Sequence, residues 1–416
     1  MLPANPPTVT PKEITLSPGG RYLKLCQVSV LEQSALAKSR WFRAFQGQEL
    51  PTDESALRYL DSVFTHFYGN AIWTKNATRR ALSRNLSARG YGPESYLQPR
   101  ASLEAQSLIN LQALLKGTIA SEQICQELPS LCQSVEKIKL LFQHNTSADN
   151  DSFHLSLPLL SSRQLELMGF EGGLNSSDFN RRFEKSDDHV FFTIRYSQRE
   201  KPQAQTTGYF GNPLFLKSTY ARTVGWVTAE EMDPHNLVLS ALASQTRSDI
   251  PEEDRVSLEE LDSLAWEEQG SALIGPSISR KAFIYAMQPG GNPLNFGCPT
   301  YHADDFQGFS HLHPTWKKIR RLQRYSDFTL PHFEQLIRTK LLNELYRLNR
   351  SKSPSDQSDW QLAKEVIGRN DPHQALQLLA LIKYHVFLPL GLSLEWELKV
   401  PVLVPPTEFT VGVPGN

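Results

Sequence analysis

The sequence lacks a long hydrophobic run and an N-terminal secretory signal. Its longest apolar runs, such as Val386 to Leu390, fall far short of the roughly 20 residues that a bilayer-spanning helix needs. We therefore predict no membrane span. The first 20 residues have neither the basic start nor the apolar stretch of a cleaved signal, and their Pro, Thr and Ser content predicts a flexible leader over residues 1–20.

The chain also lacks an excess of charge of either sign. Its 43 basic and 44 acidic residues give a formal net charge of −1, so the protein as a whole is not attracted to nucleic acid or to an anionic membrane. We expect no nucleic-acid partner. One run, Lys317 to Arg324, is locally basic and helical in pattern. It could dock an acidic protein or phosphate groups, although such a run is more often a solvated helix face.

Cysteine is scarce, and no two cysteines form a CxxC pair. The four are Cys26, Cys125, Cys132 and Cys298. They are too few and too scattered for a disulfide framework, which predicts reduced thiols in a cytosol-like compartment.

A chain of 416 residues is long enough for two or three domains. From about Asp53 to Leu141, apolar residues recur at steps of three and four, which predicts a helical N-terminal domain over 21–145. The Ser, Asn and Asp-rich segment from His144 to Ser152 then interrupts the period and is typical of a linker.

Beyond this segment the pattern changes to short apolar runs typical of strands. They cover 153–157, 188–194, 224–227 and 397–404. Helical patterns separate them, and most of about 315–385 is helical and looks inserted between strands. The fold class predicted is therefore α+β, with a second domain over 151–416.

The first of these runs ends in a strand-to-helix corner with polar side chains. His154 lies near the end of the run, Ser156 follows two residues later, and a helix closing at Gly169 comes next. Such corners can hold a small ligand, because side chains at the strand end meet the backbone N–H groups of the next helix. The alternative is a surface histidine on an edge strand.

Near the C-terminus, the stretch SLEWELKVP puts two carboxylates one residue apart. On a strand, Glu395 and Glu397 share one face and Trp396 faces the other way. Like charges held side by side raise one carboxyl pKa unless cations or hydroxyls compensate. The alternative is a solvated edge, where the pair has no effect.

The order of these features resembles the diphtheria-toxin-like ADP-ribosyltransferases of bacterial effectors and toxins. The resemblance implies that His154 holds the adenine-side ribose of NAD, with Ser156 in the Ser/Thr position of that motif. It also implies that the SDDHVFFTI strand forms the nicotinamide side, with Phe192 as the stacking surface and Thr193 after it. A flat aromatic face suits a heteroaromatic cation.

The same resemblance makes Glu397 the catalytic carboxylate of a Glu-x-Glu strand and gives Glu395 the task of orienting or activating the acceptor. It implies a split β-sheet domain with a helical insertion between Thr193 and Glu397. The implied activity is mono-ADP-ribosylation of a host protein with NAD as substrate. The implied location is the host cytoplasm, reached by secretion without a cleaved signal.

A second group of reactive residues lies between Phe296 and Pro314. It contains Cys298, His302, Asp304, Asp305, His311 and His313. Cys298 and His302 could run thiolate chemistry in a hydrolase or deamidase, and the His and Asp residues could bind a metal. We expect no metal ligands, because CxxC and HExxH spacings are absent. The segment could equally cover an NAD cleft, and a third hypothesis is a non-catalytic effector whose helical half binds a partner.

Overall fold

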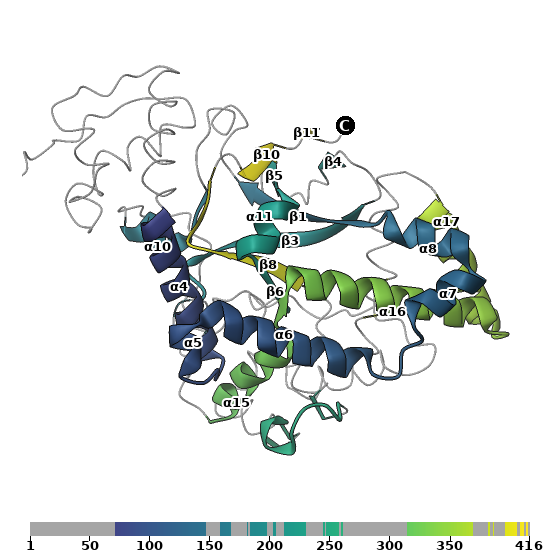
Figure 1. Ribbon diagram of the computed structural model, residues 1–416, viewed down its shortest axis with the longest axis horizontal. Coiled ribbons are helices and arrows are strands. Elements are labelled where there is room, and N and C mark those ends of the chain that lie inside the picture. Colours follow the sequence, from purple (N-terminus) through teal and green to yellow (C-terminus); the bar gives the residue numbers. More distant parts are fainter. Residues whose placement is uncertain are drawn as a thin grey trace, which may run out of the picture.

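The computed structural model describes a mixed α+β fold (Figure 1). The residues described are 71–146, 159–167, 181, 184–197, 203–204, 212–229, 244–245, 247–257, 259–260, 314–368, 382, 386, 396–405, 408–411 and 413–414. The α+β class predicted from the sequence is confirmed at this level.

The described helices are α4 (Ala71–Ala88), α5 (Glu94–Leu97), α6 (Pro99–Leu115), α7 (Ser121–Glu127), α8 (Pro129–Glu136), α10 (Ser162–Leu167), α11 (Ser218–Val224), α15 (Pro314–Leu322), α16 (Leu330–Arg350) and α17 (Pro354–Gly368). Short 3-10 turns, η3 (Glu252–Asp254) and η6 (Gln323–Ser326), complete the described helical elements.

The described strands are β1 (Lys139–Thr146), β2 (Leu159–Leu160), β3 (His189–Ser197), β4 (Gln203–Ala204), β5 (Asn212–Leu216), β6 (Trp226–Ala229), β7 (Phe328–Thr329), β8 (Trp396–Pro401), β9 (Leu403–Val404), β10 (Phe409–Val411) and β11 (Val413–Pro414).

Seven strands form the central sheet, in the order β10-β5-β1-β3-β8-β6-β7. Every neighbouring pair in it is antiparallel. Two further pairs, β2 with β9 and β4 with β11, stand outside it. The pairing of β3 with β8 joins two stretches that are far apart in the sequence, and β8 then pairs with β6 on its other side. This crossover sets the geometry of the candidate site.

Strand β1 differs from the helical prediction for this part of the chain. Residues 139–146 form a strand between β3 and β5, so the segment predicted as a linker begins inside the sheet. Leu140 and Phe142 alternate into the core opposite Tyr196 and Ile194 of β3. A short apolar run is ambiguous between helix and strand, and cross-strand partners decided this one. The described parts of both predicted domains therefore share one sheet.

The main core lies on the sheet face that carries Trp396, Leu398 and Val400 of β8. Helix α16 supplies an apolar stripe to it, and the rings of Phe333 and Trp396 lie 5.1 Å apart. Figure 1 shows α6 and α16 running alongside each other on this side of the sheet. Helix α16 was predicted as part of an insertion, yet it packs in the central core.

Helix α4 covers the opposite sheet face near β6 and β8. Leu82 and Leu86 of α4 pack with Leu103 of α6 against Trp226 of β6, and all four are buried. Trp226 is the cross-strand partner of Lys399, so it projects on the face opposite to Leu398. The polar face of β8 is thereby closed off from water by a helix.

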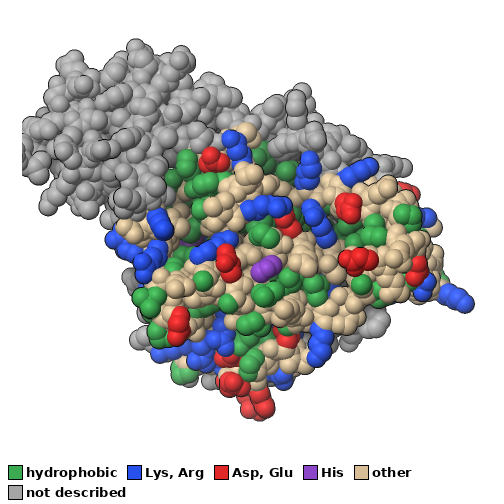
Figure 2. All heavy atoms as spheres, viewed as in Figure 1, with side chains coloured by type: hydrophobic (Ala, Val, Ile, Leu, Met, Phe, Trp, Pro, Cys, Tyr) green, Lys and Arg blue, Asp and Glu red, His purple; other side chains and the backbone are tan. Residues whose placement is uncertain are grey.

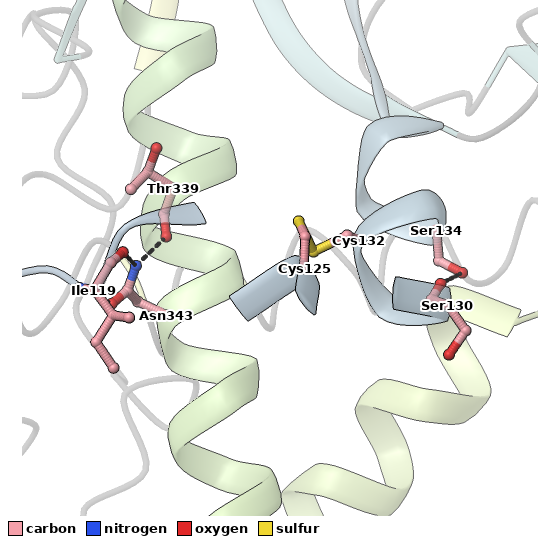
Figure 3. The surroundings of a disulfide bond; sticks show 7 residues. All are labelled: Ile119, Cys125, Ser130, Cys132, Ser134, Thr339 and Asn343. Atoms are coloured by element: carbon pink, nitrogen blue, oxygen red, sulfur yellow. Dashed lines mark hydrogen bonds between the residues drawn. A yellow bond between two sulfur atoms is a disulfide. The ribbon is translucent and has the colours of Figure 1, made fainter. Parts of the chain in front are cut away.

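A disulfide between Cys125 and Cys132 joins α7 to α8 (Figure 3). The prediction of reduced thiols was wrong for this pair, because the turn between the two short helices brings their Cα atoms to 5.5 Å. Nearby, Asn343 of α16 donates to the carbonyls of Ile119 and Thr339 at 3.0 and 2.9 Å (Figure 3). Cys26 and Cys298 lie outside the described residues.

Within the described part of the chain, no helix combines the length and apolar character needed to cross a bilayer.

Candidate active site on the polar face of the central sheet

A row of four polar side chains crosses four neighbouring strands on the face covered by α4. Gln143 of β1 is opposite Thr193 of β3, and Thr193 is opposite Glu397 of β8. Glu397 is in turn opposite Thr228 of β6. Directly opposite residues of antiparallel strands project on the same side, so the carboxylate of Glu397 stands between two threonines.

A second row lies one step further along the strands. Lys399, two residues after Glu397, is opposite Phe191 of β3 and Trp226 of β6. Its ammonium nitrogen lies 5.3 Å from the Phe191 ring centre and 5.5 Å from the Trp226 ring centre. Lys399 is fully buried. Cation–π attraction on both sides offsets part of the free energy lost when a lysine leaves water.

Asp327, which directly precedes β7, is the centre of a buried hydrogen-bond network. The network includes Thr228, the last residue of the first row. Its Oδ1 accepts from Arg89 Nη1 at 2.6 Å and from the Thr228 hydroxyl at 2.9 Å. Its Oδ2 accepts from the Tyr91 hydroxyl at 2.7 Å. Arg89 also stacks on Trp226, 4.9 Å from the ring centre. The network ties the end of α4 to β6 and β7.

Burial shifts the pKa of three groups in this region. It raises the pKa of Asp327, against the opposing effects of Arg89, Tyr91, Thr228 and Lys399. Burial also raises the pKa of Glu184 to about 7, although Lys399 and Arg89 oppose the shift. The pKa of Lys399 is lowered to about 8, chiefly by burial, while Glu184, Glu397 and Asp327 favour its charged form. Proton uptake and release near neutral pH are therefore available at this face.

Of the residues predicted from the sequence, the structure brings Glu397 and Thr193 together as direct partners on β8 and β3. Glu397 is only 6% exposed, whereas Thr193 is exposed. The strand that carries Glu397 therefore pairs directly with the SDDHVFFTI strand. His154, Ser156 and Glu395 lie outside the described residues.

Phe192 has a different position from the one predicted. It is fully buried in the main core, opposite Leu398, and therefore faces away from Glu397. A ring packed in the core cannot stack on a ligand. The alternation of a strand leaves Phe191 on the face of Glu397 and Lys399, where its ring contacts the lysine. Phe191 replaces Phe192 as the aromatic residue of the candidate site.

Sequence reasoning missed Lys399, Thr228, Arg89 and Asp327. A signal existed for Lys399, because the alternation that puts Glu395 and Glu397 on one face also puts residue 399 there. Thr228 could have been found in the same way from the β6 run. Arg89 and Asp327 carry no local signal, since only the packing of α4 on the sheet brings them together.

The rival residues Cys298, His302, Asp304, Asp305, His311 and His313 all lie outside the described residues, so the hydrolase and metal hypotheses stay predictions. Across the part of the chain that the structure describes, no three His, Cys, Asp or Glu side chains are grouped as metal ligands.

Comparison with known families and with curated proteins found no family model and no protein that matches this chain.

Proposed function

We propose that this protein is a mono-ADP-ribosyltransferase, which moves ADP-ribose from NAD to a side chain of a host protein and releases nicotinamide. The observation that carries the proposal is the direct pairing of Glu397 with Thr193 on β8 and β3. These two strands hold the SDDHVFFTI motif and the Glu-x-Glu motif of the resemblance, and they are neighbours in the seven-stranded antiparallel sheet.

In the proposed reaction, the bond between C1′ of the ribose and the nicotinamide nitrogen breaks. Nicotinamide leaves with the bonding electron pair, and positive charge develops on the sugar ring. A carboxylate fixed nearby stabilises this charge most strongly where water is excluded. Glu397 is such a carboxylate, because its side chain is flanked by Thr193 and Thr228 and the residue is only 6% exposed to water. The acceptor nucleophile then bonds to C1′ and releases its proton.

The exposure of Thr193 beside the nearly buried Glu397 supports approach of the substrate from the β3 side. Phe191 lies on the same face of the sheet, and its ring contacts Lys399, two residues after Glu397. His154, Ser156 and Glu395 keep their proposed roles in ribose binding and acceptor orientation. Action inside a host cell, as an effector, is part of the same proposal.

The test is release of nicotinamide from NAD by the full chain, followed by mass spectrometry of host-lysate proteins for added ADP-ribose. Glu397→Gln keeps the shape of the side chain and removes its charge, so we expect the rate to fall at least about 100-fold, in the range seen when one electrostatic stabiliser is removed. Glu365→Gln, on the exposed surface of α17, is the matched control and should retain the wild-type rate.

Circular dichroism should show that both variants are folded. Nicotinamide release that persists in folded Glu397→Gln, or is absent from the wild-type chain, would refute the proposal. Activity that is lost in Cys298→Ala and kept in Glu397→Gln would favour the thiolate hypothesis instead.

A further inference from the structure

Helices α5 and α6 expose large apolar side chains to solvent. In the part of the chain that the structure describes, five large hydrophobic side chains are exposed, and four of them lie on these two helices. Tyr96 and Leu97 of α5 are 52% and 70% exposed, and Leu108 and Ile109 of α6 are 44% and 57% exposed. Figure 2 shows hydrophobic side chains at the surface where α5 and α6 run in Figure 1. Such a concentration of apolar surface marks an interaction site, whereas scattered single residues do not.

The outer face of α6 has no charge over about three turns. From Ala105 to Leu115 the helix contains no Asp, Glu, Lys or Arg. Leu111 and Leu114 are buried in the main core, whereas Leu108 and Ile109 are exposed. A surface helix usually has charged side chains on its outer face, and a helix that is apolar on both faces is usually covered on both. The described residues leave the outer face of α6 open.

Small side chains connect the two pairs of large ones. Ala101 and Ala105 are exposed and lie along α6 between Leu97 and Ile109. Together with Tyr96 and Leu108 they form what is called here the α5–α6 face. Ala101 and Ile109 are about 12 Å apart along the helix axis, since a helix rises 1.5 Å per residue. A partner can approach closely at the alanines and be held by the larger side chains, which is how one amphipathic helix docks on an apolar surface.

Three cations of α4 stand at the α5 end of this face. Lys75, Arg79 and Arg80 are exposed, and none of them forms an ion pair among the described residues. The Arg79 guanidinium donates to the carbonyl oxygen of Tyr96 through Nε at 3.3 Å and through Nη2 at 3.2 Å, which fixes it beside α5. Lys75 lies one turn earlier on the same side of α4, because residues four apart are neighbours on a helix.

The other charges of residues 71–116 leave this excess of positive charge in place. Lys116, directly after α6, is an exposed cation without an ion pair at the other end of the face. Glu94 is exposed and also without an ion pair, and its carboxylate lies beside Gly92. Four unpaired cations therefore stand against one unpaired carboxylate. The remaining charged residues of this range are paired, and they are Arg84, Arg89, Arg100 and Glu104.

An amphipathic helix fits the α5–α6 face better than a bilayer does. Glu104 and Gln112 are exposed on α6 beside the apolar residues. A bilayer would have to receive both, and an anionic one would repel Glu104. A helix about 10 Å wide can cover the apolar residues and leave both polar side chains at its edge.

We propose that the α5–α6 face, with Lys75, Arg79, Arg80 and Lys116 around it, is a docking surface for an amphipathic helix of a partner protein that carries acidic residues beside its apolar side. Apolar contact supplies most of the affinity, and the opposite charges set the orientation and the rate of encounter. This surface does not depend on the reaction proposed above.

The probe is a synthetic, fluorescein-labelled helix of about 18 residues, or five turns, held helical by a side-chain staple. Leucines three and four residues apart form its apolar side, and glutamates flank that side at both ends. Its binding to the full chain is followed by fluorescence anisotropy. Leu97→Ser and Ile109→Ser should each weaken binding about five- to tenfold, because each removes an apolar contact. Lys75→Gln should weaken it about two- to fivefold, and wild-type binding should weaken as salt rises.

Leu362→Ser is the matched control, because Leu362 is a 41% exposed leucine on α17, far from α5 in Figure 1. It should bind the probe as the wild type does, and circular dichroism should show that all variants are folded. The inference is overturned if the wild type fails to bind the probe, if folded Leu97→Ser and Ile109→Ser bind it unchanged, or if a probe with lysines in place of the glutamates binds as tightly.

A membrane partner gives a different result in the same series. Binding to phosphatidylserine vesicles that Leu97→Ser and Ile109→Ser both lose, without binding of the peptide probe, would assign the α5–α6 face to a lipid surface and overturn the inference. NAD is absent from these assays, so failure of this inference and failure of the proposed transferase activity are separate outcomes.

Discussion

Arg89 and Asp327 form an ion pair whose side chains are 1% and 0% exposed, with Arg89 Nη1 2.6 Å from Asp327 Oδ1. Arg89 follows α4 and Asp327 precedes β7, so the pair links the helix that covers the polar face to the edge of the sheet. Removing one partner takes away the main compensating charge of the other, which remains buried, and this costs more than removing both.

We expect Arg89→Met to lower the free energy of unfolding by about 3 to 5 kcal/mol, measured by urea denaturation, with a similar loss for Asp327→Asn. The double variant should lose less than the sum of the two, because each single loss includes the isolation of the same partner. Arg80→Met, at an exposed position of α4, is the control and should change stability by less than about 0.5 kcal/mol. Strict additivity would contradict the structural role given to this pair.

Glu184 should make stability fall as pH rises through the acidic range. Its pKa is raised by burial from 4.5 to about 7, so the unfolded chain releases this proton first and the folded chain keeps it until about pH 7. The resulting loss, on the order of 3 kcal/mol, develops between about pH 4.5 and pH 7 and persists above it. Lys399, with its pKa lowered to about 8, titrates at higher pH.

Glu184→Gln removes this titration. Urea denaturation at several pH values should therefore give a wild-type curve that falls relative to the variant curve across this window. Parallel curves for the two proteins would show that Glu184 does not titrate there.

Gly225 should not tolerate a methyl group. A Cβ at this position would lie 2.6 Å from the carbonyl oxygen of Ala221 and 2.9 Å from Leu398 Cδ1, so backbone or core atoms must shift. We expect Gly225→Ala to destabilise the protein by about 1 to 3 kcal/mol in thermal or urea denaturation. Gly92→Ala is the control, because its added Cβ meets only the flexible carboxylate of Glu94. Equal stability of the two variants would argue against the packing of α11 on β8.

The disulfide between Cys125 and Cys132 closes a short loop, with a sequence separation of 7. Closure of such a loop in the unfolded chain contributes about 2 to 3 kcal/mol in the chain-entropy model. Reduction with dithiothreitol, or Cys125→Ser, should lower the free energy of unfolding by this amount. Dithiothreitol should then have no further effect on Cys125→Ser, and a wild-type chain insensitive to reductant would contradict the prediction.

Much of the strand and helix content could be predicted locally. The apolar runs at 188–194 and 397–404 became β3 and the β8–β9 segment, and the region predicted as helical over about 315–385 contains α15, α16 and α17. Strand β1 could not be predicted in this way, because KLLF fits a helix or a strand until β3 and β5 supply partners. The proximity of Cys125 to Cys132 likewise depends on the turn between two short helices.

The sequence by itself determined the alternation that puts Glu397 and Lys399 on one face of β8, since successive side chains of a strand point to opposite sides. The same rule separates Phe191 from Phe192. Only the tertiary structure decided which of the two aromatics meets Lys399, because that depends on which face α16 covers and which face α4 covers. It also decided that Thr193 and Thr228 flank Glu397 and that Arg89 reaches Asp327, because strand register and helix packing are set by contacts between residues distant in the chain.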